Sequence, residues 1–277
     1  MKNDSYEYSG LSLKVFFALV ISLSLAAEVV YCLGGPGWSV LVLMWIPALS
    51  ALAALIASSR GRQEKLTAKE TLRLLGLRKC PLGYILAGML IPLVYLLIPY
   101  MVYWRINPEN FAYNGVKFTL VLSDLLPVML IGNVISLVSA AGEEIGWRGF
   151  MLPALTERFG EKKTLFLTGL IWALWHLPLL IWGGYMAEAA LWYRIPAFIL
   201  CIVPIGIIAG ILTYRSGSVW PAAFLHAAHN NYDQSIFDII TRGADRMYFV
   251  SETGMITILC AWVIALALLA SFGRKSS

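Results

Sequence analysis

Long stretches of nearly uncharged residues recur from one end of the chain to the other, and they restrict the possible folds more than any other feature. Each has about 18 or more residues, enough for an α-helix to cross a hydrocarbon layer of roughly 30 Å. The chain is 59% hydrophobic and only 13% charged, as expected for a protein surrounded mostly by lipid. We therefore predict an all-α, polytopic membrane protein, a bundle of about eight transmembrane helices. The expected spans are 13–33, 38–58, 81–103, 120–141, 164–181, 195–214, 219–236 and 255–272.

The basic residues indicate how these spans are oriented. If the N-terminus is cytoplasmic, all of the 21 Lys and Arg except Arg105, Lys117, Arg194, Arg242 and Arg246 fall on the cytoplasmic side. Cytoplasmic loops of membrane proteins hold the excess of positive charge. We therefore expect both termini in the cytoplasm, and the short loops favour a prokaryotic plasma membrane. The net charge of +5 reflects this bias and does not indicate nucleic-acid binding.

Ionisable groups inside the expected spans are few. Each costs roughly 2.5–3.5 kcal/mol at a helix centre, so each is a candidate functional residue. No hydrophilic stretch is long enough to fold separately, so residues 1–277 are predicted to form a single transmembrane domain with a catalytic core at 120–236. The candidates in or beside the spans are Glu28, Glu143, Glu144, His176, His226 and His229, with Asn133, Asn230 and Asp233 as polar companions.

Two adjacent glutamates closely follow the fourth expected span. A stripe of small and polar residues that begins at Asn133 recurs every three to four residues and places Glu143 on one helical face. Glu144 lies about 100° around the helix and is four residues from Arg148, the spacing of an intrahelical ion pair. We therefore expect Arg148 to hold Glu144, and Glu143 to face the interior.

Histidines follow the same helical spacing in the fifth and seventh spans. His176 comes four residues after Trp172, and His226 comes four residues before Asn230 on a helix rich in alanine. Several polar side chains on one face of a membrane helix indicate a hydrated internal cavity. We expect the glutamates and histidines of the three spans to meet there.

This set of side chains is suited to adding water to an amide carbonyl. A desolvated carboxylate is a competent general base near neutral pH, so Glu143 with His176 could activate water. His226 with Asn230 could donate hydrogen bonds to the developing oxyanion. The sequence has no serine in a GxSxG context and no suitably placed cysteine, so water is the expected nucleophile.

A metal-dependent reaction is the mechanistic alternative. We expect no cofactor, but two histidines and a glutamate can bind zinc, so Glu143, His176 and His226 form an alternative ligand set for a divalent metal. HExxH spacing is absent. A zinc-bound water would make the histidines ligands instead of oxyanion donors.

Taken in order, these residues resemble the three motifs of the CPBP family of intramembrane endopeptidases, also called the abortive-infection or type II CAAX prenyl protease family. The matching segments are "EEIGWR", "WALWH" and "HAAHN", with tryptophan where phenylalanine is usual in the second motif. The matching positions are Glu143, Glu144, Arg148, Trp172, His176, His226 and Asn230.

The resemblance implies an all-helical membrane core with a water-filled cavity and a glutamate-dependent mechanism. It implies that the first glutamate and the second-motif histidine activate water, and that the third-motif pair stabilises the oxyanion. Trp172 is expected to alter mainly the packing of the cavity wall.

The predicted function is hydrolysis of peptide bonds in membrane-associated substrates, including prenylated CAAX-type peptides. One alternative is a non-catalytic membrane protein that binds a peptide, such as a bacteriocin self-immunity protein. Another is a proton-coupled carrier that uses Glu28 and the histidines as a relay. Glu28 itself is expected to form a hydrogen bond between helices.

Overall fold

The computed structural model describes residues 8–59 and 66–272, and in these ranges it consists of helices joined by short connections. The predicted all-α class is confirmed, since the only β-type pairing in these ranges is an isolated bridge between Phe111 and Thr241. The helices are α1 (Gly10–Cys32), α2 (Trp38–Ser59), α3 (Ala68–Leu74), α4 (Leu82–Ile106), α5 (Phe118–Glu144), α6 (Leu152–Phe159), α7 (Glu161–Trp175), α8 (Leu177–Ile181), α9 (Leu191–Ser216), α10 (Trp220–Tyr232), α11 (Arg246–Phe249) and α12 (Met255–Phe272). Short 3₁₀ turns η1 (Pro108–Asn110) and η4 (Ser251–Thr253) and π-helical turns η2 (Ile145–Met151) and η3 (Asp233–Phe237) complete the order.

Six helical segments of the described ranges are long and apolar enough to cross a membrane, which confirms a polytopic membrane protein. They coincide with six of the eight expected spans. The fifth and seventh expected spans correspond to α7, with 15 residues, and α10, with 13. Both are interrupted for local reasons: Pro178 has no N–H with which to continue α7, and α10 passes into the π-helical turn η3.

The fourth span is longer than expected. One helical segment runs from Thr119 to Phe159, because η2 joins α5 to α6 without a loop. Arg148 therefore lies inside a helix, and the span boundary that placed it in a cytoplasmic loop was wrong. All residues of η2 are buried. A π-helical turn accommodates an extra residue per turn and is common at functional sites.

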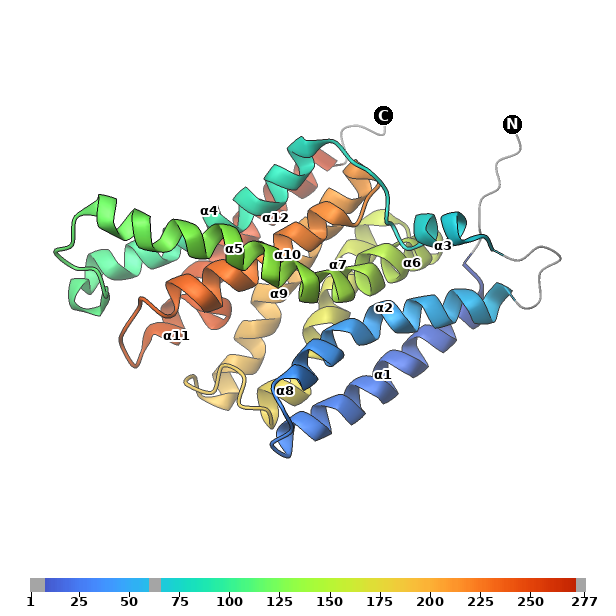
Figure 1. The fold of residues 1–277 in the computed structure, drawn as a ribbon, viewed down its shortest axis with the longest axis horizontal. Helices are drawn as coiled ribbons and strands as arrows, with labels where there is room; N and C mark the ends of the chain where they lie inside the picture. The colour runs from blue at the N-terminus through green and yellow to red at the C-terminus, as the bar shows by residue number, and fades with distance from the viewer. Residues whose placement is uncertain (1–7, 60–65, 273–277) are drawn as a thin grey trace.

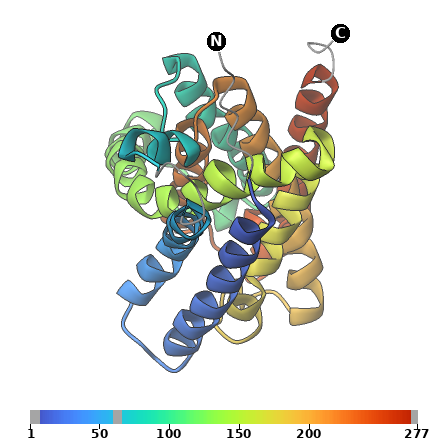
Figure 2. The same cartoon turned by 90° about the vertical axis from the view of Figure 1, so that its right-hand side faces the viewer.

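α9 packs against α7, α10 and α12, while α1 and α2 form an antiparallel hairpin at one side of the molecule (Figures 1 and 2). Most of α9 is buried. By contrast, α5 exposes a band of large apolar residues that includes Leu130, Ile131, Val134 and Ile135. Such a band is compatible with lipid and would be unfavourable in water.

Glycines allow the helices around the centre to approach closely. A Cβ atom at Gly146 would lie 2.4 Å from the Cβ of Pro47 in α2. A Cβ atom at Gly206 of α9 would lie 2.6 Å from the Cα of Gly169 in α7 and 3.2 Å from Nη2 of Arg148. Small residues at these contacts bring α2, α7 and α9 against the glutamate-bearing segment.

Candidate active site

A cavity of about 250 Å³ lies between α1, α2, α5, α7, α9 and α10. Glu143, His176, His226 and Asn230 all line it. These four side chains come from three helical segments that are up to 87 residues apart in sequence, between Glu143 and Asn230. The predicted convergence on one internal polar cavity is therefore present in the structure.

Two indole groups hold the carboxylate of Glu143. Nε1 of Trp172 donates to Oε2 of Glu143 at 2.8 Å, and Nε1 of Trp147 donates to the same oxygen at 3.3 Å. Only 1% of the Glu143 surface is exposed, so the carboxylate is fixed in a nearly dry environment. Its other oxygen, Oε1, makes no hydrogen bond to any residue in the described ranges. One oxygen is thus available for a water molecule or a substrate.

The expectation that Trp172 would affect mainly the packing of the cavity wall was wrong. A phenylalanine, the usual residue in the second motif, has no N–H and could not donate to Glu143. The indole also packs edge-to-face against the His226 ring, with centroids 5.1 Å apart, and carries the Arg148 guanidinium over its face at 4.4 Å. Trp172 therefore orients the acidic side chain as well as filling space.

Glu144 lies behind the cavity wall, where it joins two of the motifs. Its Oε1 accepts hydrogen bonds from Nη1 of Arg148 at 2.9 Å and from Nδ1 of His226 at 3.0 Å. All three side chains are buried. The predicted Glu144–Arg148 pair is present, and Glu143 faces the cavity as expected. Glu144 and Arg148 do not line the cavity themselves.

His176 is oriented by the end of its own helix. Its backbone N–H bonds to the carbonyl of Ala173, three residues back, so the carbonyl of Trp172 is left without its usual helical partner. Nδ1 of His176 lies 2.9 Å from that carbonyl. Because a carbonyl only accepts, Nδ1 carries the hydrogen. In a neutral His176 the lone pair is then on Nε2, which can accept a hydrogen bond from another group.

Asn230 completes the set from α10. It lies one helical turn from His226 on the same face, and its side chain makes no hydrogen bond with any other residue that the structure describes. Its amide is therefore available to a ligand in the cavity. The neighbouring Asn231 is engaged instead with Asn133 of α5 at 3.2 Å, which packs α10 against the glutamate-bearing helix.

The prediction missed a carboxylate and a phenol that line the cavity. Glu252 of η4 and Tyr185 of the α8–α9 connection both line the cavity, and Tyr185 donates a hydrogen bond to Oε2 of Glu252. His229 lines it as well, with Nε2 2.8 Å from Oε1 of Glu252. Both residues lie outside the expected spans, and for this reason the search for polar groups within spans missed them.

Glu28 does not make the expected hydrogen bond between helices. Its side chain is buried in α1, and Oε1 has no hydrogen-bond partner in the described ranges. It does not line the cavity. The structure therefore gives Glu28 no place among the residues that converge there.

The expected alternative metal ligands, Glu143, His176 and His226, do not come close enough to form a compact ligand set. Within residues 8–59 and 66–272, the one group of His, Cys, Asp or Glu with ligand atoms all within 4.8 Å of one another is His229, Asp233 and Glu252. The oxygens of these two carboxylates already accept hydrogen bonds from protein side chains.

Known proteins resemble the chain over the same region. The model of a family described as type II CAAX prenyl endopeptidase Rce1-like matches residues 125–232, a segment that includes every predicted site residue. The chain is also 28% identical over 235 residues to CAAX prenyl protease 2 of Methanococcus maripaludis, covering 80% of this chain and 81% of that relative. The resemblance predicted from the three motifs is confirmed.

Proposed function

We propose that this membrane protein, which resembles the Rce1-like family of type II CAAX prenyl endopeptidases, is an intramembrane endopeptidase that uses glutamate-activated water. Its proposed substrates are membrane-associated peptides, including prenylated CAAX-type peptides. The observation that carries the proposal is the convergence of Glu143, His176, His226 and Asn230 on one buried cavity.

Glu143 is the proposed general base. Oε2 accepts hydrogen bonds from the indoles of Trp147 and Trp172, while Oε1 is available to take a proton from water. Nε2 of a neutral His176 accepts the second hydrogen of that water, because Nδ1 donates to a backbone carbonyl. The water is thereby oriented with its lone pair toward the scissile carbonyl carbon.

His226 and Asn230 are the proposed oxyanion donors. Nδ1 of His226 donates to the Glu144 carboxylate, so its Nε2 carries a hydrogen when the ring is an imidazolium. Nδ2 of Asn230 supplies a second, neutral donor. As water attacks, the carbonyl oxygen becomes an anion that accepts both bonds, and donors already in place stabilise it most in the transition state.

Collapse of the tetrahedral intermediate breaks the C–N bond. The proton that Glu143 took from water passes to the departing amine, and Glu143 returns to its ionised form. The products are a new carboxylate and a new amino terminus. No electrons are exchanged with a cofactor, and we propose that the reaction needs no metal.

Glu144 and Arg148 are proposed to act through His226. Arg148 neutralises Glu144 in the buried environment, and Glu144 in turn holds the His226 ring. Removing one member of a buried charge pair costs about 3–5 kcal/mol. We therefore expect Arg148 variants to lose folded protein, and Glu144→Gln to test ring orientation more directly.

Single-turnover cleavage of a farnesylated CAAX peptide in oxygen-18-labelled water tests the reaction. The purified protein in detergent should place the label in the new carboxyl terminus of the product and none in Glu143. Label in the Glu143 carboxylate would instead indicate a covalent acyl intermediate. Cleavage that continues at the full rate in Glu143→Gln would overturn the assignment.

The orientation of the spans is proposed from charge. We place both termini in the cytoplasm of a prokaryote, with lipid around the exposed apolar band of α5. Lys2, Arg274 and Lys275, part of the charge that supports this, lie outside the described residues. Labelling of single cysteines introduced in the α2–α3 and α4–α5 connections tests it: a membrane-impermeant reagent applied to intact cells should modify only the second.

A further inference from the structure

Glu252 lines the cavity and stands at the centre of a second polar group, which is separate from the residues of the three motifs. We call this group the Glu252 cluster, and it comprises Tyr95, Tyr100, Tyr185, His229, Asp233, Ser251 and Glu252. Its members come from α4, α10, η3, η4 and the α8–α9 connection. All members except the partly buried Tyr185 are buried, and Glu252 has only 3% of its surface exposed.

Each oxygen of Glu252 is held from within the protein. Oε1 lies 2.8 Å from Nε2 of His229, whose Nδ1 lies 3.0 Å from the hydroxyl of Tyr95. Oε2 accepts the hydroxyl of Tyr185, which also accepts a hydrogen bond from Nε2 of Gln234 at 3.1 Å. Each carboxylate oxygen has two lone pairs, so each can accept one further hydrogen bond from the cavity side.

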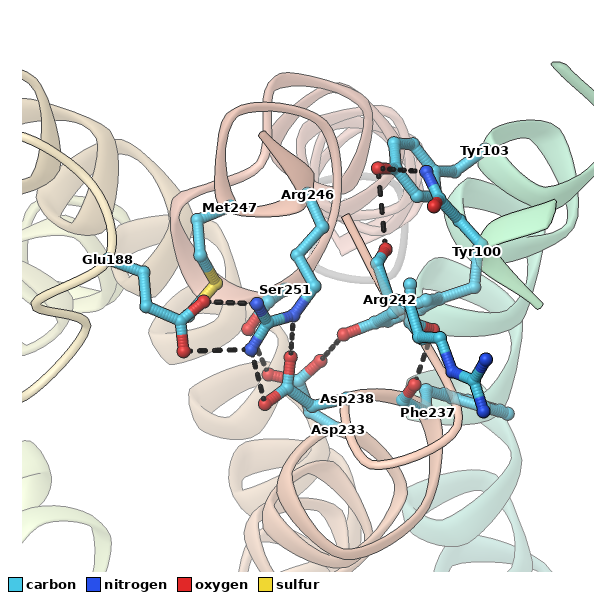
Figure 3. Close-up of polar contacts among 12 residues, drawn as sticks. Tyr100, Tyr103, Glu188, Asp233, Phe237, Asp238, Arg242, Arg246, Met247 and Ser251 are labelled. Carbon is cyan, nitrogen blue, oxygen red and sulfur yellow. Dashed lines mark hydrogen bonds and ion pairs between the residues drawn. The ribbon is translucent and has the colours of Figure 1, made fainter. Parts of the chain in front are cut away.

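The backbone next to Glu252 has an uncommon conformation. Ser251 has φ 64°, in the left-handed region that residues other than glycine rarely adopt. Its hydroxyl donates to Oδ2 of Asp233 at 2.7 Å, and Tyr100 donates to the other oxygen of Asp233 at 2.9 Å (Figure 3). Asp233 thus anchors the turn that directs Glu252 into the cavity. Such conformations persist only where the surroundings enforce them, and they cluster at functional sites.

The connection that carries Tyr185 is also fastened. Arg246 of α11 bonds to Glu188 at 2.8 Å and to Asp238 at 2.8 Å, so it links this connection to the end of η3 (Figure 3). Burial alone would lower the pKa of Arg246, but the bonds to the two carboxylates outweigh it and raise the pKa above its ordinary value. The guanidinium is therefore charged at any physiological pH.

The two sides of the cavity offer complementary hydrogen-bonding groups. Asn230 and an imidazolium form of His226 present donors, which suit the carbonyl oxygen of a peptide bond. A peptide that enters the cavity also brings N–H groups, and each one that is buried without a partner is costly. Glu252 supplies an acceptor for these groups on a rigid support.

We infer that Glu252 is a substrate-binding residue that accepts a hydrogen bond from a backbone N–H of the peptide, adjacent to the scissile bond. His229 and Asp233 are positioning residues that set the direction of its carboxylate. The inference rests on the proposed peptidase function, because it supposes a peptide in this cavity. It adds a recognition element that lies outside the three motifs.

Peptide binding in the Glu143→Gln background tests the inference without cleavage. The probe is a fluorescent farnesylated tetrapeptide, titrated into protein in detergent. Adding Glu252→Gln should weaken binding roughly 10-fold, as expected for an N–H bond that loses its charged acceptor. A set of peptides with one backbone amide replaced by an ester removes one N–H at a time. For one of these esters the 10-fold difference should disappear.

The outcomes separate this inference from the proposed function. Three results would overturn the role of Glu252. They are equal affinity for the amide peptide of Glu143→Gln with and without Glu252→Gln, a 10-fold difference in affinity that persists with every ester, and no binding of the peptide at all. Retention of cleavage by Glu143→Gln, measured separately, would overturn the peptidase mechanism alone. Glu161→Gln, an exposed change at the start of α7, is the matched control and should bind like its parent. Equal melting temperatures of all variants exclude unfolding as the cause.

Discussion

Glu143 and Glu252 line the same cavity, yet Glu143 projects from a continuous helical segment and Glu252 from a three-residue 3₁₀ turn. Glu143 is held at one oxygen by indoles, which leaves the other oxygen free for chemistry. Glu252 is held at both oxygens by an imidazole and a phenol. The difference indicates a division of roles: a carboxylate that must exchange a proton keeps one oxygen unpaired, and one that only binds is fixed at both.

The sharpest test of this division is Glu143→Gln, for which we expect the largest effect. An amide cannot take a proton from water, so kcat should fall by about 10³-fold or more, the upper part of the range for a general base. KM should change little, because the proposed role is confined to the chemical step. Rates of peptide cleavage by mass spectrometry measure both. Comparable losses in kcat for Glu143→Gln and Glu252→Gln would contradict the distinction.

Asn230→Leu tests the donor side of the cavity. Leucine has a similar volume but no N–H, so one oxyanion donor is lost while the helix is kept. We expect kcat to fall by about 10²-fold or more, as for other oxyanion donors. The neighbouring Asn231→Leu is not a neutral control, since Asn231 packs α10 against α5, and it should lower the melting temperature as well. An effect of Asn230→Leu on KM alone would place Asn230 in binding.

Trp172→Phe isolates the hydrogen bond that distinguishes this chain from the usual second motif. The aromatic packing is largely kept and the 2.8 Å bond to Glu143 is lost, so kcat should fall roughly 10- to 100-fold, the equivalent of one bond to a charged group. The matched control is Trp262→Phe in α12. It removes an indole hydrogen bond of the same length, which Trp262 donates to the carbonyl of Leu200 in α9. Equal losses in the two variants would show that Trp172 acts through stability.

The site residues that could be predicted are those whose relation is fixed by helical geometry. The pair Glu144 and Arg148, and the pair His226 and Asn230, are each one helical turn apart, so sequence spacing alone places their members together. Glu252 could not be found in this way. Its direction depends on the positive φ of Ser251 and on Asp233, which lies 18 residues away in sequence.

The fold shows the same limit. Hydropathy predicted where apolar helices lie, but not which of them are buried. α9 and α12 are the two most apolar of the spanning helices, yet most of α9 is buried, whereas few residues of α12 are. Lipid and protein interiors are similarly apolar, so the hydrophobic effect does not sort helices between them. The continuity of the helix through η2 was also not predictable, because a π-helical turn has no distinct sequence pattern.

Gly206→Ala perturbs the packing of α7 and α9 around Arg148 without removing a polar group. The added methyl would lie 2.6 Å from the Cα of Gly169 and 3.2 Å from Nη2 of Arg148, so α7 and α9 must separate. Overpacking of this kind costs about 1–3 kcal/mol. The melting temperature should fall, and kcat should decrease by only a few fold. Gly83→Ala, with no atom within 4 Å of the added Cβ, is the matched control in α4. If it were equally destabilised, close packing at Gly206 would not be the cause.

The smallest effect is expected from removing divalent metal ions. If Glu143 acts as a base held by two indole N–H groups, incubation with a membrane-permeant chelator should leave the rate of peptide cleavage unchanged. A zinc-bound water would make Glu143, His176 and His226 ligands, and their donor atoms do not form a compact set in the described ranges. Metal content of the purified protein, measured on the same sample, serves as the control. Loss of activity with the chelator and its return with stoichiometric zinc would reassign the imidazoles of His176 and His226 as ligands. Glu143 would then be bound to a metal ion, whereas Glu252 would still be held by hydrogen bonds alone.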